Sequence, residues 1–384
     1  MREDLRGVPR VGMGACVDVA DAKGVVVGHG LYDAEAALAI RVLGRATGAS
    51  LDLEALLRRR CDDARALRER VLPLEALETY RAFNGEGDGL SGLAVDVYGE
   101  YAVVELTCPV WSPHRALIVA AVQAVLKPGG GAFRGVLEKS RLRPGPGEEV
   151  RGQLSGEAPP DELWVREGPA RYAVALNGTG KSGFFIDQRE TRETLRRIAR
   201  GASAALNAFC FTGSLSVALA QGGAARVTSV DLSRPALERA RRNFEGNHLD
   251  AARHELAQGD AFALLAAFAD AGRRFDVVVI DPPAFAQSKK PDARRRTFQA
   301  ERDYSELVGK AARLLSPRGV LVASSPMAAM PMNAFEWALA DGAAQAGVRL
   351  RVFDARSQPA DHPVDPAMPE KRYLKVLFAM RAED

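Results

Sequence analysis

Four short stretches in the second half of the 384-residue chain each lie at the end of a short apolar run. In chain order they are Asn207-Ala-Phe-Cys-Phe-Thr-Gly213, Asp231-Leu-Ser233, Gly259-Asp260-Ala261 and Asp281-Pro-Pro283. Short apolar runs of this kind are typical of strands buried in a sheet. If the strands are parallel, all four stretches meet at one edge of the sheet, which is where open α/β sheets bind their ligands.

The residue types in these stretches suit a nucleoside. The carboxylate of Asp231 can accept hydrogen bonds from both vicinal hydroxyls of a ribose. Asp260 and a neighbouring backbone amide can read the amino group and a ring nitrogen of adenine. The two prolines after Asp281 stiffen the chain, so we expect the Asp281 carboxylate and the Pro282 carbonyl to point into the cleft.

The glycine content of the first stretch argues against a dinucleotide. A pyrophosphate-binding turn needs G-x-G-x-x-G for close backbone approach, and this stretch has Gly213 alone. Taken by itself, Gly213 is equally compatible with a tight strand-to-helix turn. A capping role for Asp231 is less suitable, because Ser233 is the better placed N-cap. The ordered set is the layout of a class I S-adenosylmethionine (SAM) methyltransferase, so we expect SAM as the cofactor.

Alternating strands and helices are needed to bring the four stretches to one edge. From about residue 185, short apolar runs alternate with segments of helical period, which is typical of βαβ units. We therefore predict an α/β domain, doubly wound and Rossmann-like, with a mostly parallel sheet. The expected helices are 189–200, 214–221, 233–246, 261–270, 298–315 and 333–346, and the expected strands are 204–209, 226–230, 254–258, 275–280, 320–324, 348–354 and 372–380.

The first half of the chain has a different pattern. The pattern of residues 14–43 predicts short strands around turn signals, and the spacing of apolar residues over 51–72 predicts a long amphipathic helix. The rest predicts a small α+β unit followed by a linker and a hairpin. Its expected parts are a glycine-rich loop at 83–92, strands near 93–97 and 101–107, a helix at 113–126, a strand at 134–138, a linker at 143–161 and a hairpin at 163–176.

Composition bounds the class of protein. The chain is 47% hydrophobic and 26% charged, which excludes a disordered or fibrous protein, and its net charge of +3 is uninformative about nucleic acid. The four cysteines lack C-x-x-C spacing, which excludes a disulfide scaffold and a cysteine zinc site. No apolar run reaches the ~18 residues of a membrane span, and no secretory signal is visible. We therefore expect a cytoplasmic protein without a metal or a membrane partner.

Longer motifs resemble a known family. Gly180-Lys-Ser-Gly-Phe-Phe-Ile-Asp-Gln-Arg189, the glycine-rich stretch from Asn84 to Asp96, Ala360-Asp-His-Pro-Val364 and Tyr373-Leu-Lys375 are similar to motifs of PUA-domain-containing large-subunit ribosomal RNA methyltransferases. The best-known members of that family make 5-methylcytosine. The stretches at the strand ends look like the SAM motifs of the same family, and the resemblance covers nearly the whole chain.

The resemblance implies three parts: a shortened PUA-like RNA-binding β domain at 1–48, an α+β middle domain at 49–160, and a SAM-dependent methyltransferase domain at 161–384. It implies RNA as the partner and leaves a homodimer open. In the family the D-Q-R element lies beside the cofactor, although by sequence alone it also fits a helix N-terminus with an exposed ion pair. The expected cofactor-binding residues are Gln188, Arg189, Asn207, Phe209, Phe211, Thr212, Gly213, Asp231, Leu232, Ser233, Asp260, Ala261 and Asp281.

The chain departs from the family at one position that matters for chemistry. Methylation of cytosine C5 needs a cysteine thiolate that attacks C6. The family carries this cysteine in an S-C-S element, where this chain has Pro326. Cys210 follows another strand and is more typical of a packed residue. The methylated atom of the base therefore stays open. Methyl transfer to a base nitrogen, with Phe285 stacking on the base, is an alternative that needs no cysteine. The expected catalytic residues are Asp281, Pro282 and Phe285.

Two alternatives stay open at the level of sequence. The basic stretch at 288–296 is either a contact for RNA phosphates or a solvated loop. The proline in place of the cysteine also suits an RNA-binding or ribosome-assembly factor that keeps a SAM-binding fold without catalysis.

Overall fold

The computed structural model describes residues 11–45, 50–127, 131–140, 152–177, 181–283 and 300–383. The chain forms two compact units. The first comprises Met1–Gly168, Ala175–Ser182 and Ala360–Met368, and the second comprises Pro169–Val174, Gly183–Pro359 and Pro369–Asp384.

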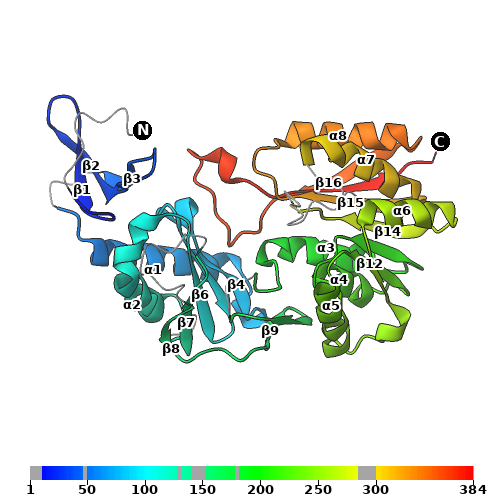
Figure 1. Cartoon of the computed structure of the whole chain (residues 1–384), viewed down its shortest axis with the longest axis horizontal. Coiled ribbons are helices and arrows are strands. Elements are labelled where there is room, and N and C mark those ends of the chain that lie inside the picture. The colour runs from blue at the N-terminus through cyan, green and yellow to red at the C-terminus, as the bar shows by residue number, and fades with distance from the viewer. Residues whose placement is uncertain are drawn as a thin grey trace. The chain divides into compact units, whose positions relative to one another are not determined.

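The first unit begins with a small antiparallel sheet (Figure 1), whose strands are β1 (Cys16–Ala20), β2 (Val26–Tyr32) and β3 (Ile40–Arg45), in that order. The turn between β1 and β2 is closed by Asp21, whose carboxylate accepts hydrogen bonds from the backbone N–H groups of Lys23 and Val25. The short strands predicted within 14–43 are confirmed.

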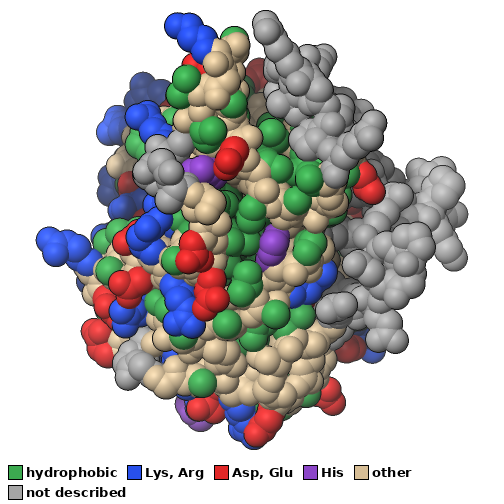
Figure 2. Space-filling view, turned by 90° about the vertical axis from the view of Figure 1, so that its left-hand side faces the viewer, with side chains coloured by type: hydrophobic (Ala, Val, Ile, Leu, Met, Phe, Trp, Pro, Cys, Tyr) green, Lys and Arg blue, Asp and Glu red, His purple; other side chains and the backbone are tan. Residues whose placement is uncertain are grey.

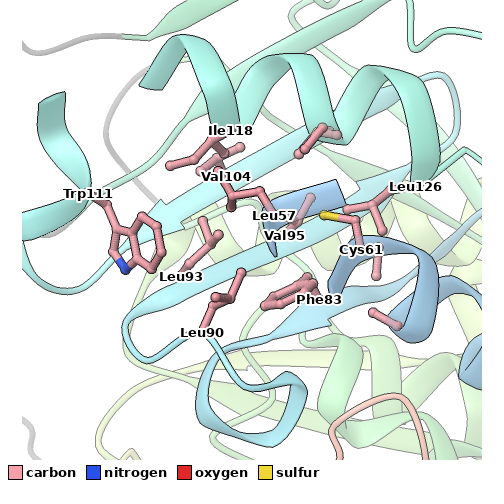
Figure 3. Packing of buried hydrophobic residues seen from close by; sticks show 14 of the residues in the cluster. Leu57, Cys61, Phe83, Leu90, Leu93, Val95, Val104, Trp111, Ile118 and Leu126 are labelled. Carbon is pink, nitrogen blue, oxygen red and sulfur yellow. The ribbon is translucent and has the colours of Figure 1, made fainter. Parts of the chain in front are cut away.

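A five-stranded sheet forms the larger part of the first unit. It contains β4 (Thr79–Asn84), β5 (Leu93–Tyr98), β6 (Tyr101–Leu106), β7 (Gly135–Glu138) and β8 (Gln153–Gly156), in that order. Helices α1 (Leu53–Val71) and α2 (Arg115–Val125) contact each other and cover the sheet. Figure 3 shows Leu57 of α1 and Ile118 of α2 pointing toward Val95 and Val104 of the sheet, all of them buried. The long helix predicted at 51–72 is confirmed as α1, whereas the α+β middle domain stays a prediction.

Two strands of this sheet differ from the sequence prediction. The prediction places Phe83 and Asn84 in a loop, but they end β4, and it places 143–161 in a linker, but Gln153–Gly156 forms β8. The prediction was wrong at both places. Because β8 lies at the edge of the sheet and both its end residues are exposed, Leu154 is its one large apolar residue, which is too weak a signal for a strand.

A buried arginine ties three segments of the first unit together. Arg68 of α1 is 1% exposed, and its two terminal nitrogens donate to the Asp88 carboxylate at 2.7 Å each. One of them also donates to the Asp361 backbone oxygen at 2.8 Å. The Asp361 carboxylate in turn accepts from the Arg81 backbone N–H. The glycine-rich loop around Asp88 and the segment Ala360–Met368 are therefore structural parts of this unit.

The N-cap of α1 allows a test of local stability. The Asp52 carboxylate accepts a hydrogen bond from the Ala55 backbone N–H at 3.0 Å. Asp52→Ala leaves that donor without its partner, so we expect the free energy of unfolding to fall by about 1 kcal/mol. Chemical denaturation measures the change, and Asp52→Asn, which keeps the acceptor, is the control. An equal loss in both variants would mean that charge, and not the hydrogen bond, stabilises the helix end.

The second unit alternates helices and strands as predicted. Its helices are α3 (Arg189–Ile198), α4 (Ser214–Gln221), α5 (Arg234–Gly246), α6 (Ala261–Asp270), α7 (Ala300–Arg313) and α8 (Met332–Gln345). Its sheet strands are β11 (Ala205–Ala208), β12 (Val227–Asp231), β13 (Glu255–Gln258), β14 (Phe275–Ile280), β15 (Leu315–Ser325), β16 (Leu350–Arg356) and β17 (Lys375–Arg381). In the predicted hairpin at 163–176, β9 (Leu163–Glu167) belongs to the first unit and β10 (Ala170–Val174) to the second.

The seven strands form one sheet in the order β13-β12-β11-β14-β15-β17-β16. The first five strands in this order are parallel, and β17 pairs antiparallel with both β15 and β16. Helices α3, α4 and α5 cover one face, and α6, α7 and α8 cover the other (Figure 1). The strand order reverses between β11 and β14, and ligands of doubly wound sheets bind at this switch point. The predicted doubly wound, mostly parallel fold is confirmed.

The described ranges lack a membrane-spanning helix and a metal-binding cluster. No helix in them combines the length and the apolar character needed to cross a membrane. In the same part of the chain, no three His, Cys, Asp or Glu side chains come together in a way that would hold a metal ion.

Candidate active site

The loop between β11 and α4 has a strained backbone. Phe209 and Phe211 have φ angles of 62° and 51°, in the left-handed region that non-glycine residues rarely adopt. Gly213 has a φ of 77°, and a Cβ added there would lie 2.8 Å from the Cβ of Ala240 on α5. Glycine is therefore needed at 213 both for the turn and for the close approach of α5. Such strain persists only where the surroundings enforce it, and it gathers at functional sites.

Asp231, at the end of β12, holds this loop. One carboxylate oxygen accepts the Phe211 backbone N–H at 2.8 Å, and the other accepts the Ser233 backbone N–H at 2.8 Å. The backbone N–H of Gly259 donates to the Asp231 carbonyl, which joins the ends of β12 and β13. The first three predicted stretches therefore meet at the carboxyl edge of the sheet.

Two further residues of the loop are anchored to the rest of the unit. The Thr212 hydroxyl donates to the Gly183 carbonyl at 2.5 Å, and the Thr212 carbonyl accepts from Asn243 at 2.8 Å. Asn207 is fully buried beneath the loop, and its amide donates to the Ser216 hydroxyl on α4 at 2.9 Å. No hydrogen-bond partner of the Asn207 side-chain oxygen lies among the described residues.

Two predicted cofactor residues also cap helices. The Ser233 hydroxyl accepts from the Ala236 backbone N–H at the start of α5, as the sequence predicts. Asp260 caps α6 through the Ala263 backbone N–H at 3.1 Å, a role that uses one oxygen of the carboxylate. The neighbouring Leu232 is 48% exposed. Ala261, the first residue of α6, is buried.

Gln188, Asp281 and Ser324 form a hydrogen-bonded group that we call the acceptor cluster. The Gln188 amide donates to both Asp281 carboxylate oxygens at 3.3 Å and to the Ser324 hydroxyl at 3.0 Å. Asp281 directly follows β14, and Ser324 is the penultimate residue of β15. The ends of two strands therefore meet Gln188, the residue that precedes α3. Gln188 is 4% exposed, and its side-chain oxygen is buried without a hydrogen-bond partner among the described residues.

Tyr304 supports the acceptor cluster from α7. Its hydroxyl donates to the Ser324 carbonyl at 2.7 Å. Burial, and secondly the charge of Asp281, raise the pKa of the Tyr304 hydroxyl well above its ordinary value. Tyr304 is therefore a neutral hydrogen-bond donor that fixes the end of β15.

Cys210 lies in the strained loop but is unsuited to act as a nucleophile. Its side chain is 6% exposed. Burial, and secondly the nearby Asp231 carboxylate, raise the pKa of its thiol well above the ordinary value. Because the thiolate is the reactive form, this environment keeps Cys210 inert. The expectation of a packed residue agrees with the structure.

Three predicted site residues remain: Arg189, Pro282 and Phe285. Arg189 is a buried first residue of α3, directly after Gln188. Pro282 is described and follows Asp281, whereas Phe285 and the basic stretch 288–296 lie outside the described residues. Tyr304 was not predicted as a site residue, because a tyrosine within an amphipathic helix pattern is typical of a core residue.

The described side chains on one face of the molecule give no further indication of an RNA-binding surface. Figure 2 shows one face of the molecule, where Lys and Arg side chains are interspersed with Asp and Glu around hydrophobic ones. Among the described side chains drawn there, no broad basic area stands out, in agreement with the small net charge of +3.

Known proteins resemble this chain along most of its length. The profile of a family described as S-adenosylmethionine-dependent methyltransferase matches residues 115–377. Ribosomal RNA large subunit methyltransferase I of Citrobacter koseri is 32% identical over 366 residues, which are 95% of this chain and 90% of that protein.

Two solved structures have the same fold and comparable size. SMU.776, a candidate methyltransferase complexed with SAH, has a TM-score of 0.85 and 26% identity, over 99% of this chain and 93% of its own. A SAM-dependent methyltransferase from Streptococcus mutans has a TM-score of 0.83 and 26% identity, with the same coverage. Together with the strand-end residues described above, these similarities show that the chain belongs to the S-adenosylmethionine-dependent methyltransferase family.

Proposed function

We propose that this protein transfers a methyl group from SAM to a base of large-subunit ribosomal RNA. The observation that carries this proposal is the acceptor cluster, with its carboxylate held by Gln188 at the switch point of the sheet. The C. koseri relative, 32% identical over 95% of this chain, is named as a ribosomal RNA large subunit methyltransferase, which supports the ribosomal substrate.

The residues at the sheet edge fit SAM. A carboxylate offers about four lone-pair positions, and the Phe211 and Ser233 N–H groups take two at Asp231, which leaves acceptors for the ribose hydroxyls. The buried side-chain oxygen of Gln188 lacks a partner within the described ranges, so a donor such as the ammonium group of SAM would satisfy it. We propose the thirteen residues predicted from the sequence as the cofactor-binding set.

Asp281 is proposed to hold the methyl acceptor. SAM supplies an electrophilic methyl group when it is bound. The Asp281 carboxylate and the Pro282 carbonyl accept hydrogen bonds from an N–H group of the base and so aim its nitrogen lone pair. As the new N–C bond forms and the bond from the methyl group to sulfur breaks, the nitrogen would lose its proton to Asp281. Phe285 is proposed to stack on the base.

A nitrogen acceptor also agrees with the cysteines of the chain. Of the four cysteines in the sequence, Cys210 alone falls in the second unit, and its thiol is kept protonated by its surroundings. Pro326 stands where the family that this chain resembles carries its nucleophile. Methylation at nitrogen needs no covalent adduct with the enzyme, whereas methylation at cytosine C5 does. We therefore propose an exocyclic or ring nitrogen as the acceptor.

The other parts of the chain are proposed to serve RNA binding. We propose a PUA-like piece at 1–48, a middle domain at 49–160 and the methyltransferase domain at 161–384. The antiparallel sheet β1–β3 and the motif resemblance support the PUA-like assignment. A cytoplasmic location and a homodimer stay predictions.

Pro326 supports a second candidate function, that of an RNA-binding or ribosome-assembly factor that binds SAM without catalysis. The two functions differ in a measurable way, because only the enzyme transfers a methyl group to RNA.

Mass spectrometry of ribosomal RNA nucleosides from cells with and without the gene tests the proposal. We expect one base methylated at nitrogen to disappear in the deletion strain. We also expect the purified protein to restore it from tritiated SAM. Loss of 5-methylcytosine would overturn the nitrogen acceptor, and an unchanged nucleoside profile without methyl transfer would favour the assembly factor.

A further inference from the structure

The chain returns to the second unit at Pro369 and reaches the carboxyl edge of the sheet at the start of β17. Because β17 runs antiparallel to β15, its first residue, Lys375, lies opposite Ser325, near the end of β15. Residues 373–375 therefore enter the sheet next to Ser324 of the acceptor cluster. Neither the cofactor set nor the catalytic set includes them.

Tyr373 holds the segment that presents Gln188. The Tyr373 hydroxyl donates to the Asp187 carboxylate at 2.7 Å. Asp187 directly precedes Gln188 in a single short 3-10 helix, Ile186–Gln188. Because these residues share one turn of backbone, a shift of Asp187 also moves the Gln188 amide, which donates to Asp281 and Ser324.

Lys375 holds the turn that follows β15. Its ammonium group donates to the Met327 carbonyl at 2.7 Å and to the Tyr373 carbonyl at 2.8 Å. The residue is 3% exposed, and burial lowers the pKa of its ammonium group. No carboxylate pairs with it in the described part of the chain. A buried ammonium group held only by carbonyls is costly, which argues for a role beyond packing.

The turn held by Lys375 borders the acceptor cluster. The Ser325 hydroxyl accepts from the Met327 backbone N–H, and the Ser324 carbonyl accepts from Tyr304. The returning segment thus contacts both sides of the cluster: the Asp187–Gln188 side through Tyr373, and the β15 side through Lys375.

We propose that Tyr373 and Lys375 are positioning residues that set the geometry of the methyl-acceptor half of the site. This inference rests on the proposed function, in which Asp281 holds the acceptor base. Tyr373 keeps Gln188 aimed at Asp281. Lys375 keeps the Ser324–Met327 turn at a fixed distance from Asp281. Neither residue touches the methyl group or the base. Their effect is on the rate of transfer once both substrates are bound.

The first test is Tyr373→Phe, which removes one hydroxyl. We expect kcat for RNA methylation to fall about tenfold, while KM for RNA and the dissociation constant for SAM stay within about threefold. The matched control is Tyr98→Phe in the first unit, where the lost hydroxyl donates to Ser182 at 3.0 Å. A kcat equal to that of the wild type, or an equal fall in both variants, would overturn the positioning role.

A double-mutant cycle with Asp187→Ala, which removes the acceptor of the Tyr373 hydroxyl, tests whether Tyr373 acts through Asp187. The two substitutions remove the same hydrogen bond. We therefore expect kcat of the double variant to lie within about twofold of kcat of the slower single variant. Rate losses that multiply would overturn the proposed path through Asp187.

Lys375→Met tests the second contact, with Lys310→Met as the control on α7, where the lysine is 3.8 Å from Glu306. We expect kcat to fall about 10- to 100-fold in Lys375→Met and to be unchanged in the control. If Lys375→Met does not fold, the Tyr373 variant and the cycle still decide the matter. A wild-type protein that binds SAM but methylates no RNA would instead reject the proposed function.

Discussion

Replacing Asp281 with asparagine is expected to lower kcat for methyl transfer about 10²- to 10⁴-fold at saturating SAM. The carboxylate accepts the Gln188 amide at 3.3 Å on each oxygen. Asparagine keeps one acceptor but presents an NH₂ group in place of the other. That group opposes the N–H of a substrate base and has no capacity to take its proton. Single-turnover methylation at saturating SAM isolates this step from any change in cofactor affinity.

The matched control lies at the opposite end of the same strand. Asp276 accepts the backbone N–H groups of Ser203 and Ala204 at 2.7 and 3.3 Å, at the amino end of β14. Asp276→Asn makes the same chemical change far from the carboxyl edge, and we expect kcat within about threefold of wild type. Wild-type kcat in Asp281→Asn would remove Asp281 from the catalytic set.

Asp231→Asn is expected to weaken SAM binding about 10- to 100-fold, since hydrogen bonds to a charged group contribute about 1.5–3 kcal/mol. The substitution replaces a carboxylate that already accepts two backbone N–H groups. The remaining lone pairs, proposed for the ribose hydroxyls, lose their charge and one oxygen. Isothermal titration calorimetry with SAM measures the change directly.

The control for Asp231 is Asp250→Asn. Asp250 also accepts a backbone N–H group, that of Ala252 at 3.1 Å, but it lies in the connection between α5 and β13. We expect its affinity for SAM to match that of the wild type. If Asp231→Asn binds SAM as tightly as the wild type and only its melting temperature falls, Asp231 supports the loop and does not bind the cofactor.

Local patterns were sufficient to predict most elements of the second unit. The predicted bounds of α4, α6 and β14 coincide with those in the structure. These elements carry their own signal, because β14 ends in the apolar run Val277–Ile280 and α6 is bounded by its capping residue Asp260. The edge strand β8 lacks such a signal, since only one of its sides is paired and Leu154 is its one large apolar residue.

A residue of the candidate site was predictable only where its side-chain chemistry and its position at the end of a strand were enough to identify its role. Asp231 and Asp281 stand at strand ends, and their carboxylates identify them. The partners of these carboxylates are different: Ser324 and Tyr304 are joined to the site by hydrogen bonds across the sheet. A serine or a tyrosine has no spacing relative to Gln188 that a sequence pattern can register, because the contact exists only after the strands are paired.

The sequence by itself determined the doubly wound fold and the order of the four strand-end stretches. These properties depend on residue type and on spacing along one segment. The tertiary structure alone decided that Gln188 meets Asp281, that a strained loop closes on Asp231, and that residues 373–375 return to the same edge. The reason is physical, since Tyr373 and Asp187 are 186 positions apart and meet only because β17 pairs with β15.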